Sequence, residues 1–430
     1  MLQRGRVKVQ KPQKPFFLQR DPERLQRIQQ AAVQIRKPIS PTSVETLYGK
    51  RLKINASRAE KFFSCKYAFF CEHGLQIRLH RKAEFSPAEY GTFVHFILQQ
   101  TIEAVLSGEG FRHTDDNRIQ VLARSFIHQY EQDVLSDFAE KNERFVYLFK
   151  RAEEDAVRAV LDTARELRKT DFVPLAFELN FGDRSLFPPI RLKNDKASVL
   201  LTGVADRVDG WENDGIVYIR IFDYKTGEKK FSFSDLWYGM SLQLVLYLLA
   251  LDSNPEAASV ALKLPQGTKV CAAGAVYQQA RSKYISLDGG ADIATARKEH
   301  EKKLRRSGFV LSSSGIPDAW EIGEEKLYSP LKYNKNGEPT GDSLLTFEEF
   351  DLLFRHTKIR LNEMAESIRA GVITADPCRM GSEEPYCRFC NLKGFCGFED
   401  GENGEFCRVM TERKKDAVME DMGKESLDNV

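Results

Sequence analysis

The sequence predicts an α/β protein, and three patterns carry that prediction. Residues 217–222 (VYIRIF) are rich in β-branched and aromatic side chains, a composition typical of a β-strand. Residues 242–251 (LQLVLYLLAL) are almost wholly apolar, as in a buried helix. Residues 90–106 repeat apolar side chains at helical spacing. At 430 residues and 42% hydrophobic, the chain can bury a large core, and its length allows two to three domains.

The elements follow one another in a definite order. We expect helices over residues 56–79, 87–107 and 114–168, then strands near 173–182, 198–209 and 216–225, a helix at 235–251, a strand near 270–278, and helices at 290–307 and 347–370. The prolines and serines of residues 38–43 and 312–317 mark loops. Periodicity alone fixes only the α/β class.

Two carboxylates and a lysine fall at strand spacing. Asp223 and Lys225 end the strand 216–225, and side chains two apart share one face, roughly 6–7 Å apart at Cα. Asp206 ends the stretch 200–206, which pairs well as a neighbouring strand. Such carboxylates suit Mg²⁺, which prefers one or two carboxylates plus water and phosphate oxygens. The simplest alternative is a solvated Asp–Lys ion pair with no catalytic role.

A cysteine cluster lies near the other end of the chain. Cys387, Cys390 and Cys396 form a C-x2-C-x5-C pattern, typical of a zinc site or an iron–sulfur cluster. Both usually need a fourth ligand. The candidates are Cys65, Cys71, Cys378 and Cys407, whereas Cys271 lies in an apolar stretch typical of a buried thiol. Spacing alone leaves zinc and iron–sulfur equally open, and a disulfide framework fits poorly in a long chain without a secretory signal.

Composition favours a soluble, cytoplasmic protein. The net charge is only +2, but residues 1–54 hold many Lys and Arg and few acids, which suits either phosphate contact or a linker. The basic run at 297–306 suits a solvated helix face. Residues 399–430 are polar, and we expect a frayed tail. The apolar run 242–251 is too short to span a bilayer. No G-x4-G-K-[ST] loop is present, so we expect no ATP motor in this chain.

Five sequence blocks, in order, carry a family resemblance. They are Ser57-Arg58-Ala59-Glu60 with Cys65, Gly91-Thr92-Phe93-Val94-His95, Gly203-Val204-Ala205-Asp206-Arg207-Val208-Asp209, Phe222-Asp223-Tyr224-Lys225-Thr226-Gly227 and Leu242-Gln243-Leu244-Val245-Leu246-Tyr247, followed by the three cysteines. Over residues 45–400 the chain resembles the RecB-like nucleases of the PD-(D/E)XK superfamily, closest to the C-terminal nuclease domain of AddB-type helicase–nuclease subunits. The resemblance implies a restriction-endonuclease-like core, a mixed sheet flanked by helices.

The resemblance also implies roles for single residues. His95, Asp206, Asp223 and the carbonyl of Tyr224 would hold Mg²⁺ or Mn²⁺. Lys225 would orient the attacking water and stabilise developing charge. Gln243 and Tyr247 match a Q-x3-Y motif near the catalytic centre, and Cys65, Cys387, Cys390 and Cys396 would hold a [4Fe-4S] cluster. Lys66 stands where the family usually has proline. The domain would run from residue 55 to 398, after a basic segment at 1–54.

Several residues have simpler interpretations. His95 has apolar neighbours at helical spacing, as a core histidine would. Gln243 and Tyr247 share a helix face and suit a core hydrogen bond. Glu178 alternates with apolar residues and is expected to face solvent, although a place near the metal is an alternative. Arg207 and Asp209 flank Asp206 and are candidates to orient it through an ion pair. Cys71 is expected to be a core residue and is the main rival for the fourth cysteine ligand.

The main hypothesis is a metal-dependent nuclease that hydrolyses single-stranded DNA, as an exonuclease, in double-strand break repair. Its expected partners are DNA ends and a helicase–nuclease subunit of AddA type. One alternative is a non-catalytic iron–sulfur scaffold that binds DNA ends. The other is a zinc-stapled DNA-repair nuclease outside the AddB group.

Overall fold

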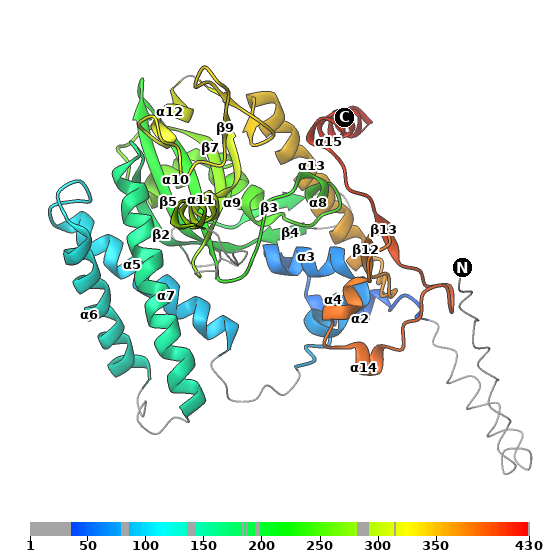
Figure 1. The fold of residues 1–430 in the computed structure, drawn as a ribbon. Coiled ribbons are helices and arrows are strands. Elements are labelled where there is room, and N and C mark those ends of the chain that lie inside the picture. The colour runs from blue at the N-terminus through cyan, green and yellow to red at the C-terminus, as the bar shows by residue number, and fades with distance from the viewer. Residues whose placement is uncertain are drawn as a thin grey trace, which may run out of the picture.

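A six-stranded mixed sheet forms the centre of the molecule (Figure 1). The computed structural model describes residues 36–78, 86–135, 143–182, 185, 187–193, 198–281, 292–313 and 315–428. The sheet has the order β11-β8-β7-β6-β5-β2. Its strands are β2 (Val173–Phe181), β5 (Gly203–Asn213), β6 (Ile216–Lys225), β7 (Lys269–Gln279), β8 (Ser307–Leu311) and β11 (Leu344–Leu345). The expected α/β class is therefore confirmed, and the sheet fits a restriction-endonuclease-like core.

The strand directions bring the start of β5 next to the ends of β2 and β6. β5 runs antiparallel to both β2 and β6, whereas β6 and β7 are parallel. A parallel pair needs a crossover, which is supplied by α9 (Gln243–Asp252) and α10 (Pro255–Ala261) between β6 and β7. None of the described helices is both long and apolar enough to cross a membrane.

Helices cover both faces of the sheet and create two cores. On one side lie α5 (Pro87–Ser107), α6 (Asp116–Val134) and α7 (Glu143–Arg168), which form their own apolar cluster (Figure 1). The ring of Tyr224 belongs to this cluster although it comes from β6. The other face is covered by α9, and α13 (Phe347–Arg369) packs over α9.

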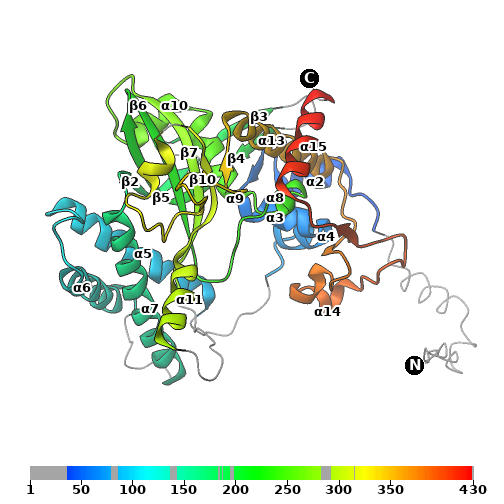
Figure 2. The ribbon, with the colours of Figure 1, turned by 45° about the horizontal axis from the view of Figure 1, so that its top comes forward.

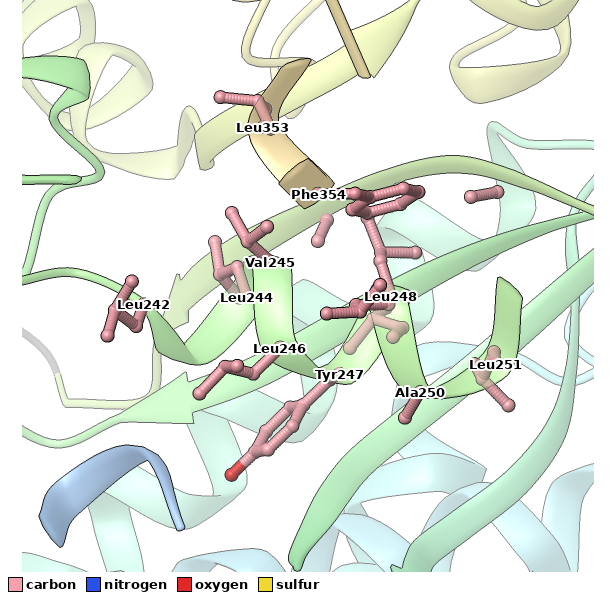
Figure 3. Close-up of a cluster of buried hydrophobic side chains, with 14 of the residues drawn as sticks. Leu242, Leu244, Val245, Leu246, Tyr247, Leu248, Ala250, Leu251, Leu353 and Phe354 are labelled. Carbon is pink, nitrogen blue, oxygen red and sulfur yellow. The ribbon is translucent and has the colours of Figure 1, made fainter. Parts of the chain in front are cut away.

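Helix α9 is the centre of the larger core. Leu353 and Phe354 of α13 lie over it, while Tyr247 extends in the opposite direction (Figure 3). Every residue from 244 to 251 is buried, which explains why the run is apolar on all sides. The expectation of a buried helix at this position is confirmed.

The remaining elements are shorter and sit around this frame. They are α2 (Pro41–Tyr48), β1 (Leu52–Ile54), α3 (Ala56–Ser64), α4 (Lys66–Phe69), a π-turn at Phe70–Gly74, β3 (Ile190–Lys193), β4 (Ser198–Leu201), α8 (Phe233–Trp237), α11 (Ile293–Leu304), α12 (Ile316–Trp320), β9 (Lys332–Tyr333), β10 (Pro339–Thr340), β12 (Cys378–Met380), a 3₁₀ turn at Tyr386–Phe389, α14 (Lys393–Cys396), β13 (Arg408–Met410) and α15 (Lys415–Asp428).

Four expected elements are interrupted, and the first three are the helices at 56–79 and 114–168 and the strand at 198–209. The helix at 56–79 breaks at Cys65, whose backbone is extended (φ −169°, ψ 121°) and starts α4. The helix at 114–168 is two helices, α6 and α7. The strand at 198–209 is also two, because β4 joins β1 and β3 in a separate small sheet before β5 begins. Apolar residues continue on both sides of Cys65, so the apolar pattern did not reveal the break there.

The polar C-terminal segment is folded, and the expectation of a frayed tail is wrong for residues 399–428. Val418 and Met422 are fully buried, and α15 packs against α13. Nδ1 of His356, on α13, lies 2.6 Å from a carboxylate oxygen of Glu425, on α15. Tertiary docking of a few apolar side chains outweighs the polar composition that predicted disorder. Of the basic segment 1–54, residues 1–35 lie outside the described part of the chain.

The expected helix at 235–251 is divided at Gly239. This residue has φ +80°, and a Cβ atom there would lie 2.4 Å from Cγ of Phe63. The turn therefore needs both a left-handed backbone and the absence of a side chain. It separates α8 from α9 and lets α9 approach β6.

We therefore expect Gly239→Ala to lower the free energy of unfolding by about 1–3 kcal/mol, through backbone strain and overpacking against Phe63. Denaturant unfolding followed by circular dichroism measures this. Gly423→Ala is the matched control, because Gly423 lies within α15 with open space around it. The control should be neutral or stabilising by up to about 1 kcal/mol. Equal stability of the two variants would contradict the role of Gly239.

Candidate metal centre

The register of three neighbouring strands gathers acidic side chains beside α5. In β5 and β6, Arg207 pairs with Phe222, which puts Asp206 opposite Asp223. In β2 and β5, Phe177 pairs with Arg207 and Leu179 with Ala205, so Glu178 lies beside Asp206. The expected pairing of the two aspartates is thus confirmed. Asp206, however, lies inside β5 and not at a strand end.

His95 of α5 completes a compact ligand group. Its Nδ1 atom lies 3.4 Å from a carboxylate oxygen of Glu178 and 3.6 Å from one of Asp206. Ligand atoms of His95, Glu178 and Asp206 all lie within 4.8 Å of one another. Nε2 of His95 lies 3.3 Å from the carbonyl oxygen of Tyr224. Carboxylate oxygens, a carbonyl oxygen and an imidazole suit Mg²⁺ or Mn²⁺, so this donor set fits the implied metal.

Asp223 belongs to the same site but faces its other side. Its carboxylate pairs with the Lys225 ammonium and accepts a hydrogen bond from the Gln243 amide. It lies outside the compact group of His95, Glu178 and Asp206.

The Q-x3-Y pair of α9 is tied to the catalytic candidates. Lys225 donates to the side-chain oxygen of Gln243 at 2.9 Å, and the Gln243 amide also lies 3.1 Å from the hydroxyl of Tyr247. The structure therefore brings Asp223, Lys225, Gln243 and Tyr247 into one hydrogen-bonded chain. A Cβ atom on Gly203 would lie 2.8 Å from Cε1 of Tyr247, so the glycine leaves room for this ring.

The charges of the centre repel one another without a cation. Burial, followed by the nearby Asp223 carboxylate, raises the pKa of Asp206 to about 7. Burial also raises the pKa of Asp223, although the Lys225 ammonium opposes that shift. Burial lowers the pKa of His95, but the Glu178 hydrogen bond and the Asp206 charge outweigh it and leave a net increase. A bound divalent cation would favour both aspartates in their ionised forms.

Glu178 is the residue that sequence reasoning left out of the site. It was expected to face solvent, and 42% of its side chain is indeed exposed, yet its carboxylate also contacts His95. Its backbone has φ +45°, a left-handed conformation that is uncommon for a non-glycine residue within a strand. Its position across β2 and β5 from Asp206 is the signal that identifies it, and that signal needs the strand register.

Arg207 and Asp209 do not orient Asp206, contrary to that expectation. Successive strand residues point to opposite faces, so both side chains leave the metal centre. Arg207 lies 2.9 Å from Asp209 with both side chains fully buried, and it donates to the Tyr224 hydroxyl at 3.2 Å. The backbone N–H of Tyr224 instead holds Asp206, at 2.6 Å from Oδ2. Arg207 thus acts on the centre only through the ring of Tyr224.

Four cysteines from the two ends of the domain line one cavity of about 410 Å³: Cys65, Cys387, Cys390 and Cys396. Cys65 comes from the break between α3 and α4, whereas the other three come from the loop around α14. Cys71, the main rival, is fully buried and does not line the cavity. Cys378 and Cys407 do not line it either.

The thiols around this cavity favour their neutral forms in the metal-free chain. Burial raises the pKa of Cys65 to about 12. Burial and the neighbouring Cys390 thiolate raise the pKa of Cys387. A cation in the cavity would reverse both effects, because metal binding requires and stabilises thiolates. The cavity and its donor set therefore fit a thiolate-bound metal group.

Lys66, which replaces the proline usual in the family, binds Asp376 through both its backbone and its side chain. Its backbone N–H, which proline would lack, donates to Asp376 at 2.9 Å, and its ammonium pairs with the same carboxylate. Arg408 also contacts Asp376, at 2.9 Å. Asp376 thus ties the first cysteine segment to β13.

A pair of strand carboxylates with a lysine, next to an imidazole on a flanking helix, is an arrangement typical of metal-dependent phosphodiesterases. The family model described as PD-(D/E)XK nuclease superfamily matches residues 53–397. The chain therefore belongs to the PD-(D/E)XK nuclease superfamily.

Curated relatives are consistently named as one subunit of an ATP-dependent helicase/deoxyribonuclease. The chain is 28% identical over 384 residues to that of Clostridium acetobutylicum, covering 88% of this chain and 33% of the relative. It is 27% identical over 392 residues to that of a Thermoanaerobacter species, covering 90% and 33%. It is 28% identical over 392 residues to that of Clostridium novyi, covering 90% of this chain and 34% of the relative. The chain spans about a third of these relatives, and the expected likeness to AddB-type subunits is confirmed.

The raised pKa of Asp206 has a measurable consequence. In the metal-free protein, a folded-state pKa near 7 exceeds the unfolded value, so stability is greatest when the carboxyl is protonated and falls as the pH rises from about 4 to 7. Asp206→Asn removes this titration and keeps an oxygen to accept the Tyr224 N–H. In EDTA we expect the variant to melt above the wild type at pH 8, by a few degrees, with little difference at pH 4.5.

Addition of Mn²⁺ at pH 8 should reverse that order, because the cation stabilises only a chain that binds it well. Differential scanning fluorimetry of both proteins measures all three conditions: EDTA at pH 4.5, EDTA at pH 8 and Mn²⁺ at pH 8. A wild type that melts above Asp206→Asn in EDTA at pH 8 would contradict the proposed charge repulsion.

Proposed function

We propose that this chain is a Mg²⁺- or Mn²⁺-dependent deoxyribonuclease that hydrolyses single-stranded DNA as an exonuclease. The observation that carries the proposal is the convergence of Asp206, Asp223 and Lys225 with His95 and Glu178 at one edge of the sheet. The bound metal would polarise the scissile phosphate and lower the pKa of water beside it. His95, Asp206, Asp223 and the carbonyl of Tyr224 would hold that metal, with Glu178 beside them.

The protein side chains have separate tasks in the proposed reaction. Lys225 orients the attacking water, which meets the phosphorus in line with the departing 3′-oxygen, and its charge stabilises the oxygens of the transition state. Gln243 accepts a hydrogen bond from Lys225 and donates to Asp223, so it fixes the spacing between the lysine and the carboxylate. Tyr247 extends this chain from α9 through the hydrogen bond that its hydroxyl accepts from Gln243, and we propose that it lies near the bound strand.

We further propose that Cys65, Cys387, Cys390 and Cys396 hold a [4Fe-4S] cluster. One zinc ion would hold its thiolates roughly 3.8 Å apart, from Zn–S bonds of ~2.3 Å in a tetrahedron. Among the described residues, no three cysteine sulfurs all lie within 4.8 Å of one another. A cluster is larger than one ion and spaces its ligands more widely, and the cavity of about 410 Å³ accommodates it. Its role would be to join the first and last segments of a domain spanning residues 55–398.

The cellular setting follows from the relatives and is part of this proposal. Proteins named as a subunit of an ATP-dependent helicase/deoxyribonuclease share most of this sequence region. We propose that the chain acts in the cytoplasm in double-strand break repair, on DNA ends opened by a helicase–nuclease partner of AddA type. The basic segment 1–54 would contact phosphates or that partner.

Lys225→Ala tests the catalytic assignment. We expect a 10²–10⁴-fold loss of kcat on end-labelled single-stranded DNA with Mg²⁺, because a charge-stabilising and water-orienting group is removed. The matched control is Lys335→Gln, on the exposed turn between β9 and β10, which should cleave like the wild type. Normal cleavage by Lys225→Ala would remove the lysine from the mechanism. DNA binding without cleavage by the wild type, also with its partner present, would favour the scaffold alternative.

Cys390→Ser tests the metal assignment of the cavity. Purified without oxygen, the wild type should be brown and contain iron and sulfide in equal amounts. The variant should lose both and melt at a lower temperature, because the two chain ends are no longer joined. Cys271→Ser is the matched control, since Cys271 lies on β7 away from the cavity. A colourless wild type with one bound zinc would contradict the cluster and support the zinc-stapled alternative.

A further inference from the structure

A second pocket lies beside the metal centre, between α5, α7 and the ends of β6 and β7. It measures about 120 Å³ and is lined by Ser86, Pro87, Tyr90, Leu148, Arg151, Asp155, Thr226 and Arg281. None of these residues belongs to the metal centre or to the cysteine cavity. The pocket nevertheless adjoins the centre in the chain, because Thr226 directly follows Lys225.

The same helix links the pocket with the metal centre. Tyr90 and His95 both lie on α5, five residues and therefore about 7.5 Å apart along the helix axis. Five residues also turn the helix by about 500°, so the two side chains project about 140° apart around α5. A strand that passes the metal centre and follows α5 would reach this pocket within a few nucleotides. In both ribbon views α5 and α7 lie together on the same side of the sheet (Figures 1 and 2).

The charge of the pocket suits an anion. Two guanidinium groups, of Arg151 and Arg281, line it together with one carboxylate, of Asp155. The hydroxyl of Thr226 and that of Ser86 add neutral polar groups. Asp155 is 7% exposed and accepts a hydrogen bond from the Tyr90 hydroxyl at 2.9 Å. Its carboxylate is therefore already engaged by the pocket wall.

Asp155 also orients the side chain of Arg281. Nε of Arg281 lies 3.8 Å from Oδ2 of Asp155, and the guanidinium stands 5.4 Å from the centroid of the Tyr90 ring. These two contacts hold a side chain that is 49% exposed, so its remaining N–H groups stay accessible. Arg158 pairs with the other oxygen of Asp155, at 3.9 Å, but does not line the pocket. Arginine presents several donors in a rigid fork, which matches phosphate geometry.

We propose that this pocket binds a backbone phosphate of the DNA strand, a few nucleotides from the scissile phosphate, with Arg281 as its main ligand. The inference rests on the proposed nuclease function and adds a subsite to it. The contact reads no base, because phosphate carries no sequence information, and its effect is to fix the register of the strand on the metal centre. A strand too short to reach the pocket loses this contact and binds more weakly.

The test compares Arg281→Gln with Arg158→Gln, two changes that remove the same charge from the same Asp155 carboxylate. A fluorescent 20-nucleotide single strand serves as the binding probe, by anisotropy in EDTA over a series of salt concentrations. For Arg281→Gln we expect a 5- to 20-fold higher Kd and a salt slope smaller by about 0.7, the value for one phosphate contact on a single strand. KM should rise with kcat unchanged, and thermal unfolding should match the wild type.

Arg158→Gln should leave Kd, salt slope and KM at wild-type values, and Arg281→Lys should restore most of the salt slope. A strand with neutral methylphosphonate linkages, moved one position at a time from the cleavage site, locates the contact. One linkage should weaken binding to the wild type and have no further effect on Arg281→Gln.

Two outcomes overturn the inference alone, with a wild type that binds and cleaves DNA. In one, Arg281→Gln retains the wild-type Kd and salt slope. In the other, Arg158→Gln loses as much affinity as Arg281→Gln, which would show diffuse surface attraction. A wild type that neither binds nor cleaves DNA, alone or with its partner, would overturn the proposed function together with this subsite.

Discussion

The antiparallel pairing of β5 with β6 is the contact on which the rest of the site depends. It places Asp206 against Asp223 in a nearly dry position, where burial raises the pKa of both carboxyl groups and the Asp223 charge raises that of Asp206 further. Three neighbouring groups stabilise the buried carboxylates: the backbone N–H of Tyr224, the ammonium of Lys225 and the imidazole of His95. A divalent cation is the remaining element that satisfies this charge pattern. The fold thus buries two carboxylates close together at the site where the reaction is proposed, and a bound cation would lower the free energy of their ionised forms.

The surrounding core explains how such a cluster stays in position. α9 is buried on every side between the sheet and α13, and it carries Gln243 and Tyr247 to the centre from a rigid element. On the opposite face, Arg207 is fully buried, pairs with Asp209 and donates a hydrogen bond to the hydroxyl of Tyr224. The backbone of Tyr224 in turn contacts both His95 and Asp206. One support is the buried helix α9 and the other is the buried ion pair of Arg207 and Asp209, so the groups of the metal centre are held from both faces of the sheet.

Much of this arrangement could be read from the chain, because strand and helix periods fix which side chains share a face. The β6 strand, the buried helix and the roles of Gln243 and Tyr247 as a pair follow from spacing and motif order. Glu178 could not be assigned, since its place depends on the register of β2 against β5 and on its left-handed backbone. Likewise, the folded α15 depends on a docking surface on α13 that lies far away in the sequence.

The sequence by itself determined the class of fold, the order of the motifs and the chemical types of the groups: hard oxygen donors with a lysine, and soft thiolates at short spacing. These are local properties of neighbouring residues. Only the tertiary structure decided which groups meet. It brought Cys65 to a cavity with three cysteines more than three hundred residues away, turned Arg207 from Asp206 toward Tyr224, and set Arg281 beside Asp155. Such contacts depend on packing across the whole chain, which no local pattern encodes.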